Sequence, residues 1–410
     1  MNIIFVCDNT AKTVDANLHI CQRLAHWMQQ QGHTAVMLGN CEQRTDARQC
    51  EVDGIPYVRF YYPINRITHS ILQQYQATGS KAGLVLSLCR HPLTALVGAV
   101  RWLCGFNPIE NKYRAAIQKL AAAVHADAVI AEAGSFYTVH ALAGTQLPCR
   151  KIGYMLDPYW KNHITGGQRA KKEELFAWAH LDAMAVPPLL ASDYNAPEFC
   201  RYKSKMLVTE FPGIAQCTQA AGGEPDGKIH LLFAGNFYAD IRSPQRLYAL
   251  LQIMDARVVL HVVGSRYGQE QPQTMALEAR LAAEGKLCLH GSLTHAQALA
   301  AMQRADILIN IGNTVENQLP SKIFEYFSAG KPVVHLRKIK KDPCLPYLQQ
   351  YPCALVLDEQ ADLAQNEKAF AAFCAQYAGT AVPFDTVQSI FKECTAAYVG
   401  QQLLTAVQKQ

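Results

Sequence analysis

The stretch from residue 305 to residue 336 reads ADILINIGNTVENQLPSKIFEYFSAGKPVVHL. It begins with the apolar run ADILINIG and ends with KPVVHL, and apolar runs bounded by Gly and Pro are typical of buried strands. Between them, SKIFEYFSAG has apolar residues at helical spacing, so the stretch predicts a strand, a loop, a helix and a second strand. This order favours a parallel sheet. The helix also carries Ser321, Lys322 and Glu325, which packing against a sheet does not require.

The same alternation extends through the second half of the chain. Thr294 and Gln297 form a predicted capping box that opens a helix over 294–305. Further strands are expected at KIHLLFAG (228–235), VVLHVVGS (258–265), KLCLHG (286–291) and CALVLD (353–358). The second half therefore predicts one domain of alternating strands and helices around a parallel sheet.

The first half shows a similar but less regular alternation. Strands are expected at 2–7, 34–39, 83–88, 127–133 and 150–156, with a helical stretch at 92–123. Residues 212–228 contain many Gly and Pro and have no periodicity, which favours a domain boundary. We expect domains at 1–212 and 228–383 with a linker at 213–227, and a last helix at 384–410 that packs back on the first domain.

Composition limits the class of protein. The 410 residues are 50% hydrophobic and 17% charged, which predicts two folded domains rather than a disordered chain. No apolar run is long enough to span a membrane, and the N-terminus lacks the pattern of a signal peptide. The 14 cysteines are scattered without metal-binding spacing. We therefore expect a cytoplasmic, reduced protein with no metal and no cofactor.

The positive charge lies in the first half. Residues 1–215 contain 21 Lys and Arg against 16 Asp and Glu, whereas residues 216–410 contain 17 of each. This excess fits an ordinary solvated surface, or a surface for an anionic partner such as a lipid headgroup or a diphosphate-linked acceptor. Nucleic acid is not expected, because no binding module is present. The apolar segment 93–106 fits either a core helix or a helix on a membrane surface.

Two interpretations fit the polar side chains of the opening stretch. On a helical wheel Ser321, Lys322 and Glu325 share one face. In the first interpretation, Lys322 and Glu325 form an exposed ion pair of little energetic weight. In the second, the polar loop 313–318 and this face bind a phosphorylated sugar at the carboxyl edge of the sheet, where ligands of such sheets bind. Lys322 would then contact phosphate, and Glu325 would accept hydrogen bonds from a ribose.

ENQLPSKIFEYFSAGKPVV resembles the donor-binding segment of GT-B glycosyltransferases, in particular those of the retaining family 4. The resemblance extends through LLFAGNFYADIRSP, HVVGS, HGSL and YMLDPYW over nearly the whole chain. It implies an α/β GT-B fold, in which two Rossmann-like domains face each other across a cleft and the C-terminal helix crosses back to the first domain. The first domain would bind the acceptor, and the second the nucleotide sugar.

The resemblance also assigns roles to residues. It implies that Glu325 binds the donor ribose, that Arg242 grips the pyrophosphate together with Lys322, and that the loop at 316–318 faces the donor sugar. The expected donor-binding residues are Gly235, Asn236, Arg242, Gly264, Ser265, Asn317, Gln318, Ser321, Lys322 and Glu325.

The chain departs from the family pattern in two places. The pattern of two glutamates eight positions apart would require Glu at 317, where this chain has Asn317 with Glu316 one place earlier. The histidine that many members carry in the first domain is matched most closely by Asp157. We expect Asp157 and Glu316 as catalytic candidates, although Asp157 also fits a turn residue. Tyr159 and Trp160 would stack on an acceptor sugar or simply close the cleft.

These expectations together describe a metal-independent glycosyltransferase of the hexosyltransferase type, retaining rather than inverting. It would move a sugar from a nucleotide diphosphate sugar to a saccharide or lipid-linked acceptor in cell-surface polysaccharide or glycan synthesis. The basic first domain would allow peripheral contact with an anionic membrane. Two alternatives stay open: a nucleotide-sugar 2-epimerase of the same fold, and a catalytically silent partner subunit that binds donor or lipid.

Overall fold

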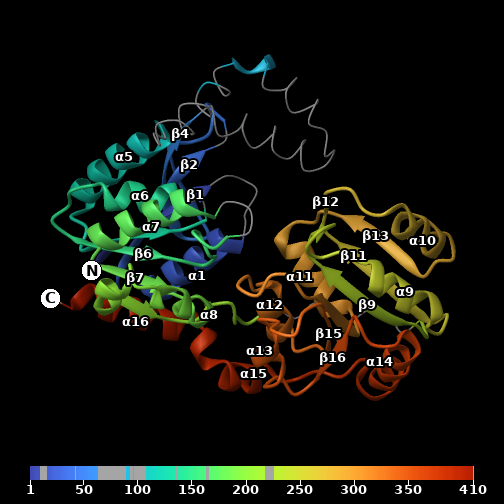
Figure 1. Cartoon of the computed structure of the whole chain (residues 1–410). Helices are drawn as coiled ribbons and strands as arrows, with labels where there is room; N and C mark the ends of the chain where they lie inside the picture. Colours follow the sequence, from blue (N-terminus) through green and yellow to red (C-terminus); the bar gives the residue numbers. More distant parts are fainter. Residues whose placement is uncertain are drawn as a thin grey trace. The chain divides into compact units, whose positions relative to one another are not determined.

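The chain forms two compact units in a computed structural model that describes residues 1–9, 16–41, 43–62, 89–92, 96, 108–134, 136–162, 166–217 and 226–409 (Figure 1). Of the described residues, those within 1–212 and 393–409 form the first unit, and those within 213–392 form the second. The chain thus leaves the first unit at Pro212 and returns to it at Glu393.

The first unit is built on a sheet with the strand order β3-β4-β2-β1-β5-β6-β7-β8. Its strands are β1 (Asn2–Asn9), β2 (Thr34–Cys41), β3 (Gln49–Val52), β4 (Ile55–Tyr61), β5 (Ala128–Glu132), β6 (Arg150–Tyr154), β7 (Ala183–Val186) and β8 (Met206–Val208). All neighbouring pairs are parallel except β3 and β4. The chain order along the sheet reverses between β1 and β5.

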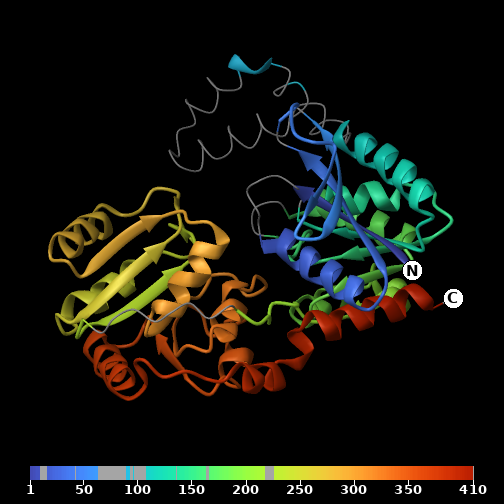
Figure 2. The same cartoon turned by 180° about the vertical axis from the view of Figure 1, so that it is seen from behind.

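Helices cover both faces of this sheet. On β1, Ile3 and Phe5 face one core, which is completed by α1 (Ala16–Gln30) and α16 (Ala396–Gln408) (Figure 2). Ile4 and Val6 point the other way, as the two-residue period of a strand requires. The core on that side is completed by α5 (Pro108–Val124), α6 (Tyr137–Ala143) and α7 (Gln168–His180). Shorter elements follow at α8 (Pro188–Ala191), η1 (Ser192–Asn195) and η2 (Cys200–Lys205).

The second unit has a fully parallel six-stranded sheet in the order β13-β11-β9-β14-β15-β16. The strands are β9 (Ile229–Ala234), β11 (Val258–Val263), β13 (Leu287–Gly291), β14 (Ile307–Ile311), β15 (Val333–Arg337) and β16 (Ala354–Asp358). Numbered within the unit, this is the order 3-2-1-4-5-6 of a doubly wound sheet, which reverses between β9 and β14. A small separate ribbon pairs β10 (Phe237–Tyr238) with β12 (Arg266–Tyr267).

Helices of the second unit also divide between the two faces. The core under α9 (Gln245–Ile253), α10 (Pro272–Ala283) and α14 (Leu363–Tyr377) contains the largest set of buried aliphatic side chains of this unit. The remaining helices are α11 (His295–Arg304), α12 (Lys322–Ser328), α13 (Leu345–Leu348) and α15 (Phe384–Ile390). A 3-10 turn, η3 (Lys392–Cys394), precedes α16.

The structure confirms most of the predicted elements and corrects one. All strands expected in the second half are present, and Thr294 and Gln297 form the predicted capping box. The single helix expected over 384–410 is wrong, because α15 ends at Ile390 and Thr395 caps a new helix. The strand expected at 83–88 and the segment 93–106 lie outside the described residues. None of the helices within the described ranges combines the length and apolar character needed to cross a bilayer.

Candidate functional site

The carboxyl edge of the second unit's sheet carries a glycine after each of three neighbouring strands. Gly235 follows β9, Gly264 follows β11 and Gly312 follows β14. The edge includes the point between β9 and β14 where the strand order reverses, which is where doubly wound sheets bind their ligands. Glycine there lets a ligand approach the backbone closely. Gly235 and Gly264 were predicted as donor-binding residues, whereas Gly312 was not.

Gly264 and Gly235 lie in direct backbone contact. Gly264 has φ = +142°, and a Cβ at this position would lie 1.9 Å from the carbonyl oxygen of Gly235. The two loops are joined further by Asn236, whose Oδ1 accepts a hydrogen bond from the backbone N of Ser265 at 2.9 Å. The hydroxyl groups of Ser265 and Ser292 are 2.8 Å apart. The structure therefore brings together Gly235, Asn236, Gly264 and Ser265, four of the residues predicted to bind the donor, and their contact with a donor stays a prediction.

Arg242 lies at the same edge, held by an amide from the neighbouring loop. Its Nε and Nη2 donate to Asn313 Oδ1 at 3.0 and 2.7 Å, and Asn313 Nδ2 donates to the carbonyl of Gln318 at 2.9 Å. The Nη1 atom lies 3.8 Å from the position that a Cβ would take at Gly235. The guanidinium is thus fixed beside the glycine that ends β9, at the reversal of the strand order.

The surroundings of Arg242 lower its pKa through burial, while nearby acidic groups that include Asp342 act in the opposite direction. An arginine remains protonated at any physiological pH even with a lowered pKa. Because Asn313 is neutral, the hydrogen bonds that hold the side chain do not cancel its charge. The site therefore contains a fixed cation directed by a neutral amide, an arrangement suited to an anionic ligand.

Lys322 and Glu325 form an ion pair on α12. Lys322 Nζ lies 2.7 Å from Glu325 Oε2, and the side chains are 33% and 12% exposed, respectively. The expectation of an exposed pair is therefore wrong for the carboxylate, which is mostly buried. The next residue, Tyr326, accepts from the backbone N of Ala234 and donates to its carbonyl, so α12 is tied to the end of β9.

The other residues predicted in the loop have varied surroundings. Asn317 and Gln318 are half-buried, and Gln318 contributes its carbonyl to Asn313. Ser321 is the residue before α12, but its side chain makes no capping hydrogen bond. Glu316, a catalytic candidate, is 63% exposed and lies 3.9 Å from Lys341 Nζ, an exposed ion pair of small energetic weight.

Three predicted residues belong to the first unit and lie after β6. Asp157 is half-buried. Tyr159 stacks on Phe136 with ring centroids 4.0 Å apart, and its hydroxyl donates to Glu173. The ring of Trp160 packs against other side chains: Phe199 at 5.9 Å, with the ammonium groups of Lys161 and Lys171 at 4.9 and 4.8 Å from its centroid. These contacts favour a packing role for Tyr159 and Trp160. The binding of an acceptor sugar by the two rings stays a prediction.

The reversal point of the first unit's sheet holds a carboxylate that the sequence interpretation missed. Glu132 ends β5 and is 3% exposed, and its Oε1 accepts from Asn17 Nδ2 at 2.9 Å. The hydroxyl of Thr138 donates to the Glu132 carbonyl. The sequence contained a sign of this residue's role. DAVIAEA is an apolar strand with a charged residue, Glu132, at its carboxyl end, which is the end of a parallel strand where ligands bind.

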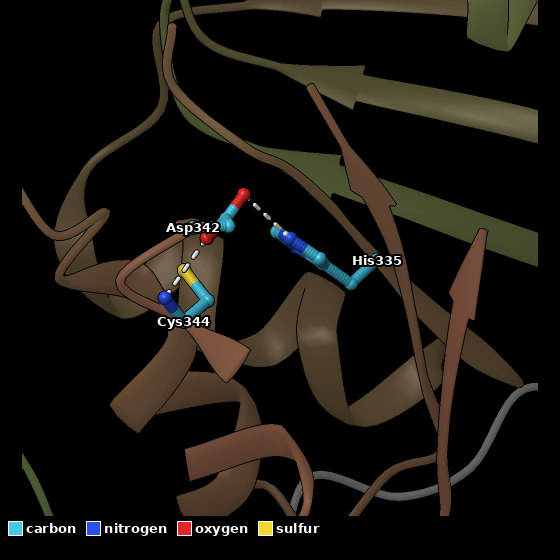
Figure 3. Close-up of side chains that lie close together, drawn as sticks. All are labelled: His335, Asp342 and Cys344. Atoms are coloured by element: carbon cyan, nitrogen blue, oxygen red, sulfur yellow. Dashed lines mark hydrogen bonds and ion pairs between the residues drawn. The ribbon is translucent and has the colours of Figure 1, made fainter. Parts of the chain in front are cut away.

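A cluster of polar side chains is buried beneath the carboxyl edge of the second unit's sheet. Within the described residues, these are the side chains grouped closely enough to hold a metal ion. The ligand atoms of His335, Asp342 and Cys344 all lie within 4.8 Å of one another and are buried (Figure 3). The same side chains already hydrogen-bond to one another and to Asn310. A metal ion would have to replace those bonds.

Comparisons with known proteins agree with the architecture. No family model matches the sequence, and no curated protein matches it. Solved structures do match along the whole chain. Sucrose-phosphate synthase from Thermosynechococcus elongatus is 13% identical with a TM-score of 0.64, covering 99% of this chain and 100% of that one. A glycosyltransferase from Rickettsia africae ESF-5 is 12% identical with a TM-score of 0.60, covering 99% and 97%.

A third match is informative because of its ligands. Anabaena Alr3699/HepE in complex with UDP and glucose is 12% identical with a TM-score of 0.59, and both chains are covered completely. At such low identity these similarities establish the fold and not the activity. The two doubly wound units and these matches together show that the chain has the GT-B fold.

Proposed function

We propose that the protein is a glycosyltransferase that binds a nucleotide diphosphate sugar at the carboxyl edge of the second unit's sheet. The sugar would move to a saccharide or lipid-linked acceptor. The observation that carries the proposal is Arg242, whose guanidinium is held by Asn313 beside Gly235 where the strand order reverses. The UDP complex of a protein with the same fold supports the choice of ligand.

Arg242 and Lys322 would stabilise the charge that develops on the leaving diphosphate. Preorganised cations at such a position commonly supply the largest part of catalysis. Arg242 is already directed by two hydrogen bonds, so little reorganisation is needed. With two cations available, we propose that the reaction is metal-independent.

Glu325 would accept hydrogen bonds from the hydroxyl groups of the donor ribose. Its carboxylate is 12% exposed and is shared with Lys322 at 2.7 Å. Binding would redistribute this pair, Lys322 turning to phosphate and Glu325 to the ribose. A charge-assisted hydrogen bond contributes about 1.5–3 kcal/mol, more than a partly exposed ion pair. The exchange is therefore favourable on energetic grounds.

The remaining roles are proposals of the same kind. Gly235, Asn236, Gly264 and Ser265 would pass close to the donor, and Asn317, Gln318 and Ser321 would face its sugar. In the first unit, Asp157, Tyr159 and Trp160 would contact the acceptor, and Glu132 is added because it closes β5 at the reversal point. We propose a retaining enzyme of the hexosyltransferase type, with Asp157 and Glu316 as catalytic candidates, that serves polysaccharide synthesis and contacts an anionic membrane through the basic first unit.

The test is titration calorimetry with UDP, GDP, ADP and dTDP on the wild type and on Arg242→Gln. Glutamine keeps a hydrogen bond to Asn313 but removes the charge, so the Kd of the tightest diphosphate should rise by about 10–100-fold. Arg257→Gln is the matched control, because Arg257 is 72% exposed and pairs with Asp255 on the surface of the same unit. No binding of any of the four diphosphates to the wild type, or equal affinity in Arg242→Gln, would overturn the proposal.

Measuring donor turnover tests whether the reaction needs a metal ion, independently of whether the donor binds. With a nucleotide sugar that carries the tightest diphosphate, sugar transfer or slow donor hydrolysis should continue in EDTA. Activity that disappears with EDTA and returns with Mn²⁺ would show that metal independence is wrong while leaving the donor site intact.

A silent donor-binding subunit remains a second candidate because of Asn317 and Glu316. The family pattern implies glutamate at 317, and Glu316 instead forms an exposed contact with Lys341. NMR observation of the nucleotide sugar with a panel of acceptors distinguishes the two functions. Donor binding without any consumption would favour the silent subunit.

A further inference from the structure

A polar cluster is buried directly beneath the proposed donor site. It comprises Asn310 on β14 together with His335 on β15 and Asp342 and Cys344 in the loop before α13. Figure 3 shows the last three side chains. Their exposed fractions are 3%, 0%, 3% and 0%. Burying a carboxylate is costly unless hydrogen-bond donors surround it, so a cluster of this kind requires an explanation.

The hydrogen bonds assign the protonation states of the cluster. Asn310 Nδ2 donates to His335 Nδ1 at 2.8 Å, which leaves the ring proton on Nε2, and Nε2 donates to Asp342 Oδ2 at 3.0 Å. The backbone N of Cys344 donates to Asp342 Oδ1 at 2.9 Å. Burial would raise the pKa of Asp342, but the bonds from His335 and Cys344 prevail and lower it. Burial likewise raises the pKa of the Cys344 thiol.

The carboxylate of Asp342 packs against the backbone of Gly312, the residue before Asn313, and Asn313 holds Arg242. A Cβ at Gly312 would lie 2.2 Å from Asp342 Oδ2 and 3.3 Å from His335 Cε1. The backbone N of Gly312 is itself bonded to the carbonyl of Leu336 at 2.9 Å. The residue after Gly312 is Asn313, whose amide oxygen receives both hydrogen bonds from Arg242. Asp342 thus supports the turn that holds the guanidinium.

Asp342 also acts on Arg242 through charge. It is among the groups that raise the pKa of Arg242 against the larger effect of burial. A negative charge one layer behind the site stabilises the cation without occupying the hydrogen-bond donors that a ligand would use. Arg242 stays protonated without Asp342, so it is the loss of its placement that should weaken an anionic ligand more than a neutral one.

We propose that Asp342, oriented by the hydrogen bond from His335, is a positioning residue that fixes the Gly312–Asn313 turn and thereby aims Arg242 at the diphosphate of the donor. This inference rests on the proposed function of the Arg242 site. Asp342 acts through Asn313 and does not touch the substrate.

The experiment compares Asp342→Asn with the wild type by calorimetry, using UDP, GDP, ADP and dTDP and the four matching nucleosides. The tightest diphosphate should bind about tenfold more weakly to Asp342→Asn, whereas its nucleoside should change by less than about twofold. In an Arg242→Gln background the additional effect of Asp342→Asn should vanish, because coupled residues are not additive. Asp255→Asn is the control, since Asp255 is 55% exposed in the same unit.

Three results would overturn the inference. They are equal diphosphate affinity in Asp342→Asn and the wild type, equal weakening of diphosphate and nucleoside, and an additive effect in the double variant. Failure of the wild type to bind any diphosphate would instead refute the proposed function.

A second measurement needs no variant and covers the case in which Asp342→Asn does not fold. Nitrogen-15 spectra of histidine-labelled wild type should show one buried imidazole whose proton lies on Nε2. A proton on Nδ1, or a stoichiometric metal ion found by elemental analysis, would contradict the assigned hydrogen bonds and with them the proposal.

Discussion

Glu174 should make the stability of the first unit depend on pH. The side chain, on α7, is fully buried and accepts hydrogen bonds from the backbone N of Trp160 at 3.1 Å and the hydroxyl of Tyr194 at 2.5 Å. Burial raises its pKa from 4.5 to about 7, although these hydrogen bonds oppose the change. The carboxyl group thus holds the segment that carries Tyr159 and Trp160 against α7.

The direction of the effect follows from the raised pKa. The folded protein binds the proton of Glu174 more tightly than the unfolded chain does, so this group stabilises the fold fully below pH 4.5. That stabilisation is lost as the pH rises through about 7. The difference of about 2.5 in pKa corresponds to about 3 kcal/mol at 1.36 kcal/mol for each pKa unit.

Glu174→Gln tests this magnitude. Its amide oxygen can accept from Trp160 N, and its NH₂ group can donate to the Tyr194 oxygen in place of the bond that the hydroxyl donated, so both contacts can persist. All four tryptophans occur within the residues of the first unit, so urea unfolding followed by tryptophan fluorescence reports on that unit. Between pH 4.5 and pH 8 the wild type should lose about 3 kcal/mol relative to Glu174→Gln. Parallel profiles for the two proteins, or a wild type that gains stability relative to the variant, would refute the reasoning.

Two further predictions concern the second unit. Gly264→Ala should lower the thermal midpoint strongly and weaken diphosphate binding, because its Cβ would lie 1.9 Å from the Gly235 carbonyl oxygen. The control Gly285→Ala has open space at φ = +70° and should lower the free energy of unfolding by only about 1 kcal/mol. Equal losses of stability in the two variants would contradict the argument. Burial, together with the charges of His230 and other neighbours, lowers the pKa of His261 from 6.5 to about 4. The unit should therefore lose stability as the pH falls from 6.5 toward 4, and an NMR titration of His261 with a midpoint near 6.5 would refute this.

Regular alternation in the sequence was sufficient to predict the six strands of the second unit's parallel sheet, although not the small β10–β12 ribbon. Each strand of this sheet is a short apolar run, and Thr294 marks the start of one of the helices between them, so local pattern and tertiary fold agree. The C-terminal segment shows where pattern fails. Its apolar residues continue at helical spacing from 384 onward, but Thr395 can cap a new helix, and α16 buries Leu403 against the first unit's sheet. Tertiary packing decides where such a helix breaks.

The residues of the candidate site differ in how visible they are in sequence. Gly235 and Arg242 stand next to a recognisable strand end, so their place at the carboxyl edge could be expected. Asp342 and His335 could not be linked, because their contact depends on how the loop after β15 folds back under Gly312. Glu132 was visible as a strand-end carboxylate, but the reversal between β1 and β5 that makes this position special is a property of the assembled sheet.

The two cations of the site differ in the group that holds each of them, and this difference assigns their roles. Arg242 is held by the neutral amide of Asn313, so its position is fixed while its charge remains available. Lys322 is held by the carboxylate of Glu325, so its charge is neutralised until the pair separates. An ion pair with a one-third exposed lysine contributes at most about 1 kcal/mol, which a diphosphate can readily replace. In the proposed donor site, Arg242 would therefore be the permanent anchor for an anion, and Lys322 and Glu325 would be the part that rearranges as the donor binds.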